Sequence, residues 1–307
     1  MMRYALARDI LGSRLEVAIE QDEFEIAAAS YHSLQLAVAA EELFDAIARN
    51  FIDFESDMLR STLETFSVGF GTGMEQLAIR RLLNRRISNL LSATRAYYDH
   101  MKHAAKMIFN KDARYDEIIT SFSYHYDQNL SYRVMEALRN YSQHCGLPIH
   151  SVVYRTKVLR DKKGAPLKHT ISPNLDVGRL KSDDQFKASV LRELESKSNS
   201  QAIDLKAFTR NYVMCLAEVH ELFRTYAASV TSAANEQLEG FVKMYSRQSP
   251  DQDVRMGLYA VAFEGNSWNK RIPLFSGLWE YGEYLVNTNL HFVHAGIWFV
   301  SGELDGA

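Results

Sequence analysis

The stretch MEQLAIRRLLNRRISNLLSATRAYYDHMKHAAKMIF, residues 74–109, sets the expected fold of this chain. Its apolar residues recur at steps of three and four, as in Leu83, Ile87 and Leu90, which is the period of an amphipathic helix. The glycine-rich GFGTG precedes the stretch and the polar NKDAR follows it, and both are typical of helix boundaries. We therefore predict one long helix over residues 74–109.

Helical patterns continue on both sides of this segment. Residues 25–69 predict one long helix or two shorter ones, and residues 115–145 predict another, which could bend near Asn129. The chain has no proline before Pro148, so no helix-breaking proline interrupts the helical pattern of this part. Short connections between such helices favour an antiparallel helical bundle, which we expect to form a first domain over residues 1–150.

The period changes after Pro148. Residues with β-branched and aromatic side chains lie on both sides of the turn DKKG and predict a β-hairpin over residues 152–172. Residues 257–275 form a second candidate hairpin, and helical patterns lie between the two. We expect a second domain over residues 151–307, a β-hairpin with a helical region that packs on the bundle. The fold class is mainly α, with one or two inserted β-hairpins.

Composition and charge limit the classes of function. The 307 residues are 47% hydrophobic and carry a net charge of −3, which excludes a strongly basic nucleic-acid coat and leaves only local basic patches to bind RNA or DNA. Cys145 and Cys215 do not belong to a CxxC pair. The N-terminal stretch lacks the pattern of a signal peptide, and no run of about 20 apolar residues follows. We expect a cytoplasmic protein with no membrane association.

Two pairs in the chain have an arginine followed five places later by a histidine: Arg139 with His144, and Arg95 with His100. On a helix, such residues lie about 140° apart, so a guanidinium and an imidazole can approach one phosphate from two directions. Arg139 is followed by polar Asn140 in the last turns of a helix, whereas Arg95 lies in the middle of one. Context therefore favours the pair at the end of the helix.

The segment LRNYSQH, residues 138–144, resembles the RxxxxH signature of the HEPN ribonuclease superfamily, whose members are small helical bundles. The resemblance implies a metal-independent endoribonuclease, a toxin or defence effector, that cleaves RNA by attack of a 2′-hydroxyl on the adjacent phosphate. Arg139 would then hold the phosphate, Asn140 would orient the groups, and His144 would carry the proton. The resemblance also implies a homodimer and no cofactor or metal. The expected partners are RNA, a second copy of the chain, and an antitoxin or other regulatory protein.

A basic stretch supports RNA as the partner. The segment IRRLLNRR contributes Arg81, Arg85 and Arg86, which we predict to bind RNA together with Tyr141 beside the motif. If the helices over 74–109 and 115–145 are antiparallel, Arg139 lies level with Arg85. A second cationic path for RNA would be the hairpin residues Arg155, Lys157, Lys162 and Lys163.

Other interpretations stay open for the same residues. The arginine run can be a solvated helix face, and Arg139 and His144 can be favoured by the helix dipole alone. His100 and His103 could meet His125 and bind a metal, although such groups are more often structural. The C-terminal aromatic residues fit a core better than a base-stacking platform: Trp279, Tyr281, Tyr284 and Trp298. The alternative function is a non-catalytic helical scaffold that binds nucleic acid or protein.

Overall fold

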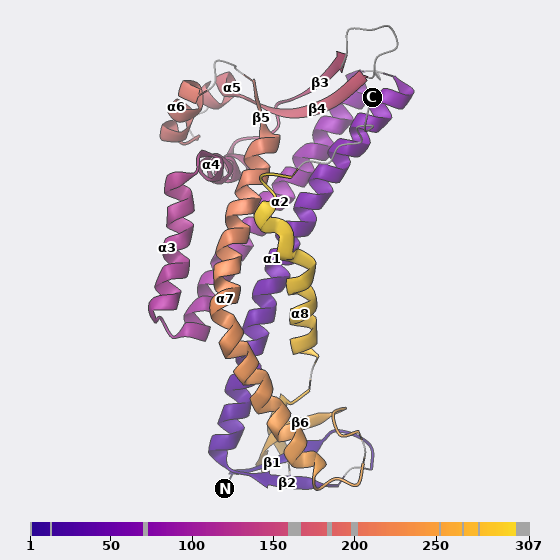
Figure 1. The fold of residues 1–307 in the computed structure, drawn as a ribbon, viewed down its shortest axis with the longest axis vertical. Coiled ribbons are helices and arrows are strands. Elements are labelled where there is room, and N and C mark those ends of the chain that lie inside the picture. Colours follow the sequence, from indigo (N-terminus) through magenta and orange to yellow (C-terminus); the bar gives the residue numbers. More distant parts are fainter. Residues whose placement is uncertain are drawn as a thin grey trace. The chain divides into compact units, whose positions relative to one another are not determined.

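The computed structural model describes residues 2–12, 14–69, 73–158, 167–182, 186–197, 202–251, 253–265, 267–275 and 277–298. The fold is mainly helical: eight α-helices and one 3-10 turn make up 69% of the described residues, and two small antiparallel sheets accompany them (Figure 1). The helices are α1 (Gln21–Val68), α2 (Gly73–Phe109), α3 (Ala113–Gln128), α4 (Leu130–His144), α5 (Val177–Ser182), α6 (Ala188–Lys197), α7 (Leu205–Ser246) and α8 (Leu278–Asn289), with a 3-10 turn η1 (Leu290–His294). The strands are β1 (Met2–Arg8), β2 (Glu16–Ile19), β3 (Ser151–Val158), β4 (Leu167–Asp176), β5 (Ala202–Asp204), β6 (Leu258–Glu264) and β7 (Ser267–Pro273).

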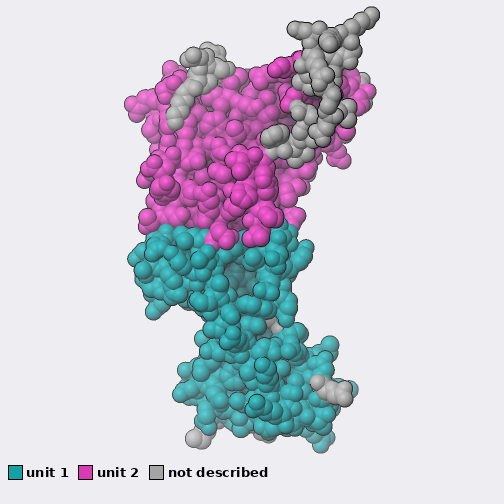
Figure 2. Space-filling model, in the orientation of Figure 1, with its two compact units in different colours: residues 1–42, 100–118, 222–289 teal, residues 43–99, 119–221, 290–307 magenta. Residues whose placement is uncertain are grey.

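The chain divides into two compact units, coloured separately in Figure 2. Unit 1 takes residues 1–42, 100–118 and 222–289, and unit 2 takes residues 43–99, 119–221 and 290–307. Both units combine segments from either side of residue 150. The division into domains at that residue stays a prediction.

Unit 1 contains a sheet with the strand order β2-β1-β6-β7, in which every neighbouring pair is antiparallel. Side chains of β1 alternate between two apolar clusters: Leu6 packs with Phe24 and Phe241 of the helices, while Ala5 and Ala7 pack on the other side. Burial on both faces is what keeps this inner strand in place. The local sequence pattern does not indicate β1, because its helix-forming residues find their partner β6 only near the other end of the chain.

Unit 2 contains a second sheet with the order β3-β4-β5, again antiparallel. Both stretches predicted as hairpins thus contain antiparallel strand pairs, β3 with β4 here and β6 with β7 in unit 1. The predicted turn DKKG lies outside the described residues.

The predicted helix over 115–145 is two helices rather than one. Asn129 separates them: its backbone is extended, and its side-chain oxygen accepts hydrogen bonds from the N–H groups of Ser131 at 2.9 Å and Tyr132 at 3.4 Å. This is an N-cap, which begins α4 in a new direction across that of α3 (Figure 1). The change of direction decides where the candidate motif at the end of α4 lies.

None of the helices, as far as the chain is described, has both the length and the apolar character of a membrane span.

Candidate functional site

The candidate motif occupies the last turns of α4, in unit 2. Asn140 and His144 are both exposed and lie four residues apart, so they share one face of the helix. Arg139 reaches the same face, because its Nη2 donates a hydrogen bond of 3.0 Å to Oδ1 of Asn140. Asn140 therefore lies between the guanidinium on one side and the imidazole one turn further along.

The Arg139 guanidinium is also held from behind. Its side chain is only 13% exposed, and Nη2 lies 3.3 Å from a carboxylate oxygen of Glu136. Glu136 is itself fixed by the Tyr212 hydroxyl, which donates a hydrogen bond of 2.6 Å, and burial raises the pKa of that hydroxyl. Nε of Arg139 is buried and has no hydrogen-bond partner within the described part of the chain. The guanidinium is thus fixed in orientation but still has one unsatisfied donor.

Arg139 and His144 do not contact each other. Among the described residues no hydrogen bond joins the two side chains, which agrees with their positions about 140° apart on the helix. An anion that engages both must therefore lie on the exposed face near Asn140.

The basic stretch of α2 holds the segment that follows this motif. Asn84 Nδ2 donates to the Ile149 carbonyl at 2.9 Å, and the Ile149 N–H donates back to Asn84 Oδ1 at 2.8 Å. Arg80 adds a hydrogen bond of 3.1 Å to the carbonyl of His150. Asn84 and Ile149 are both 1% exposed, so these are buried bonds. The basic stretch and the end of α4 are thus neighbours through the short segment between them.

The predicted register needs a correction. We placed Arg139 level with Arg85, on the assumption of one continuous helix after Asn110. Because α4 begins anew at Asn129, the residue that meets this level of α2 is Ile149.

The predicted RNA-binding arginines fall into two groups. Arg81 and Arg85 are exposed, and on the helix both lie within about 100° of Asn84, to the same side of it. Arg86 differs: Nε donates to Asp57 at 2.7 Å and Nη1 donates to Asp53 at 2.7 Å. The hydrogen bond to Asp57 raises the pKa of Arg86, with the two carboxylate charges adding to it. Arg86 is thus held by two carboxylates of α1, and its assignment to the RNA-binding set stays a prediction.

Tyr141, also assigned to the RNA-binding set, lies in the interior. It is 7% exposed, and its ring packs edge-on against His150 and Phe186 in the core of unit 2. A buried ring cannot stack on a base. Gly146 lies against it, since a Cβ there would come within 3.1 Å of the Tyr141 hydroxyl.

The hairpin offers a second cationic surface. Arg155 and Lys157 are exposed on β3. Lys162 and Lys163 lie outside the described residues.

A cavity of about 380 Å³ in unit 2 adjoins the motif and was not predicted. It is connected to the site through Glu136, which lines it and holds Arg139. Arg95 of the other RxxxxH pair also lines it, but Arg95 is paired with Asp99 at 2.8 Å and lies over the Tyr98 ring. The full lining is Arg95, Tyr98, Phe122, Ser123, Tyr126, Asp127, Tyr132 and Glu136. Its residues come from three helices, which is why no local pattern in the sequence indicates it.

The histidines weighed as metal ligands have other surroundings. His125 is 8% exposed, its pKa is lowered by burial, and Nε2 lies 3.4 Å from Glu218. Across the described ranges, no group of three or more His, Cys, Asp or Glu side chains is arranged to hold a metal ion.

Three of the four C-terminal aromatic residues are not core residues, contrary to expectation, whereas Trp279 packs against the apolar cluster of unit 1. Tyr281, Tyr284 and Trp298 are exposed, and Trp279 is half-buried. Trp279 lines a separate cavity in unit 1.

No protein-family model matches the chain, and comparison with curated proteins and with solved structures gives no match either. The resemblance to the HEPN superfamily therefore rests on the motif at the end of α4.

Proposed function

We propose that the end of α4 is the active site of a metal-independent endoribonuclease. The observation that carries the proposal is the hydrogen bond from Arg139 to Asn140, which brings a fixed cation onto the same exposed helix face as His144. A cation that binds phosphate and an imidazole that transfers a proton are the two groups this reaction needs.

The proposed step is a transesterification. The 2′-oxygen of one ribose forms a bond to the adjacent phosphorus, its proton passes to a base, and the bond from phosphorus to the 5′-oxygen breaks as that oxygen takes up a proton. The products are a 2′,3′-cyclic phosphate and a 5′-hydroxyl, and no oxidant or metal is required. His144 transfers a proton in this step, and Arg139 stabilises the extra phosphoryl charge.

The surroundings of Arg139 fit this role. The half-buried Glu136, itself held by the buried Tyr212, fixes the guanidinium from behind, so little reorganisation is needed when phosphate binds.

A homodimer fits the same chemistry. One histidine can remove a proton or deliver one at a given moment, whereas two copies of the motif would supply both groups. We accordingly include in the proposal a homodimer that acts in the cytoplasm, as a toxin or defence effector, with the antiparallel bundle expected from the sequence as its scaffold. An antitoxin or other regulatory partner belongs to the same proposal.

RNA would approach along α2. Arg81 and Arg85 are exposed beside Asn84, which binds the segment directly after the motif. Phosphates held by these arginines would lead the backbone toward His144.

The alternative, a non-catalytic scaffold, is favoured by one observation. The Arg139 guanidinium already has a carboxylate partner in Glu136 and is largely buried, which is sufficient to explain it as a structural residue. In that case α4 would bind nucleic acid or protein without cleaving it.

A cleavage assay in EDTA separates the two. Purified full-length chain is incubated with RNA, and the product ends are analysed for 2′,3′-cyclic phosphate. The control variant is His100→Ala, at an exposed histidine of the other pair. The enzyme is supported if the parent and His100→Ala cleave RNA and Arg139→Ala does not. RNA binding without cleavage in every form of the protein supports the scaffold.

A further inference from the structure

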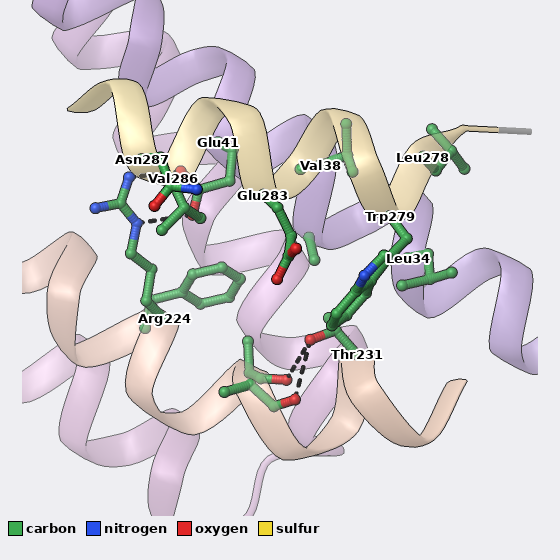
Figure 3. A pocket seen from close by; sticks show the side chains of 15 residues that line it. Leu34, Val38, Glu41, Arg224, Thr231, Leu278, Trp279, Glu283, Val286 and Asn287 are labelled. Atoms are coloured by element: carbon green, nitrogen blue, oxygen red, sulfur yellow. Dashed lines mark hydrogen bonds and ion pairs between the residues drawn. The ribbon is translucent and has the colours of Figure 1, made fainter. Parts of the chain in front are cut away.

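Unit 1 contains a cavity of about 270 Å³ that neither the sequence analysis nor the proposed function uses (Figure 3). Its walls come from α1, α7 and α8. Each of the three helices contributes a small residue to the lining: Ala37 of α1, Ala227 of α7 and Gly282 of α8. Gly282 lets α8 approach α1, because a Cβ there would come within 3.3 Å of Val38. The helices pack closely, but these side chains are too short to fill the space between them.

The charged side chains of the cavity leave one negative charge uncompensated. Arg224 and Glu41 form a bidentate pair of 2.9 and 2.7 Å, and both are largely buried, so their charges cancel. Thr231 donates its hydroxyl to carbonyls of its own helix. The Glu283 carboxylate, by contrast, has no hydrogen-bond or ion-pair partner among residues that the structure describes, and it projects from α8 toward α7 (Figure 3).

An aromatic ring lies one helical turn before this carboxylate. Trp279 and Glu283 are four residues apart on α8 and therefore share one face, and Figure 3 shows both side chains directed toward α7. Leu34 and Leu278 add hydrocarbon to the wall beside Trp279 (Figure 3). A tryptophan face beside a carboxylate is a site for an organic cation, because both attract positive charge while the ring also covers an apolar body.

We propose that this cavity binds a small amphipathic organic ammonium ion. The ammonium group pairs with Glu283, and an aromatic or branched hydrocarbon body lies against Trp279 and Leu34. The volume lies below the range of about 300–1,000 Å³ that is usual for drug-sized ligands, so the ligand is a small monoamine. An organic anion is disfavoured by Glu283. The site is independent of the proposed ribonuclease, since no residue of the α4 motif lines it.

Calorimetric titration of the full chain tests the proposal with three probes of similar shape: 2-phenylethylamine, neutral 2-phenylethanol and anionic 3-phenylpropionate. We expect the amine to bind most tightly and the anion least. Glu283→Gln should weaken amine binding by about two- to fivefold, the effect of a solvent-exposed ion pair, and leave the alcohol unchanged. Glu280→Gln, which removes the same charge from an exposed position of α8 outside the cavity, should leave both unchanged. Higher salt should weaken only the amine.

A second variant tests the location. The longer side chain of Ala37→Leu extends into the cavity and should weaken the binding of every probe that the parent binds. Three results would overturn the proposal: no saturable heat with the amine up to its solubility limit, equal affinity for the amine and the alcohol, or equal effects of Glu283→Gln and Glu280→Gln. If Ala37→Leu does not fold, the comparison of Glu283→Gln with Glu280→Gln still tests the proposed site.

Discussion

Replacement of Asn84 by leucine tests whether α2 holds the segment that follows the α4 motif. The leucine side chain has a similar volume but cannot replace the two hydrogen bonds to Ile149, at 2.8 and 2.9 Å, so a buried N–H and a buried carbonyl lose their partners. Each such group costs about 1–3 kcal/mol, and the sum of the two predicts a loss of about 2–6 kcal/mol in the free energy of unfolding. Urea denaturation of the full chain measures this loss, provided that the slope against urea stays that of the parent.

Hydrogen exchange at the Ile149 amide gives a local readout of the same change. In the parent this N–H is bonded to Asn84 and buried, so it should exchange slowly, and in Asn84→Leu it should lose most of its protection. Asn89→Leu is the matched control, because Asn89 is exposed on the same helix and should change stability by no more than about 0.5 kcal/mol. A loss below about 1 kcal/mol in Asn84→Leu, with Ile149 still protected, would refute the reasoning.

Three further outcomes are expected. Arg86→Met should lower the free energy of unfolding by about 1–2 kcal/mol, because it leaves the largely buried Asp57 unpaired. Arg85→Met on the same helix should have little effect, and denaturant unfolding of both variants measures the difference. Burial, reinforced by nearby positive charge, lowers the pKa of His150, so below about pH 6.5 the unfolded chain binds more protons than the folded chain. The free energy of unfolding should therefore fall as the pH is lowered below about 6.5. In denaturant unfolding over the same pH range, His150→Gln should show a weaker fall. Joint replacement of Arg81 and Arg85 by alanine should reduce the slope of log RNA affinity against log salt by about 1.4, and an unchanged slope in a filter-binding series would show that RNA takes another path.

The sequence predicted the helical elements best, because long amphipathic periods are local. The helix expected over residues 74–109 is α2, and the strands β6 and β7 fall within one of the stretches expected to form hairpins. The inner strand β1 was not predicted, because its stability comes from β6 and from two apolar clusters assembled at a distance in the sequence.

Prediction of the site was limited by the same cause. The exposure of Asn140 and His144 follows from their place at the end of a helix, which the sequence indicates. The burial of Tyr141 and the pairing of Arg86 depend on Phe186 and Asp57, which other elements supply. Spacing within one helix gives no information about such partners.

The cleavage rate of His144→Ala tests the central proposal most directly. Because His144 is exposed, its loss should leave the circular dichroism spectrum and the melting temperature as in the parent. With matched folded protein and one RNA substrate in EDTA, we expect the rate to fall by about 10²–10⁴-fold, the usual contribution of a general acid or base, while His100→Ala keeps the parent rate. A folded His144→Ala variant that cleaves as fast as the parent would contradict the assignment of the active site to the end of α4.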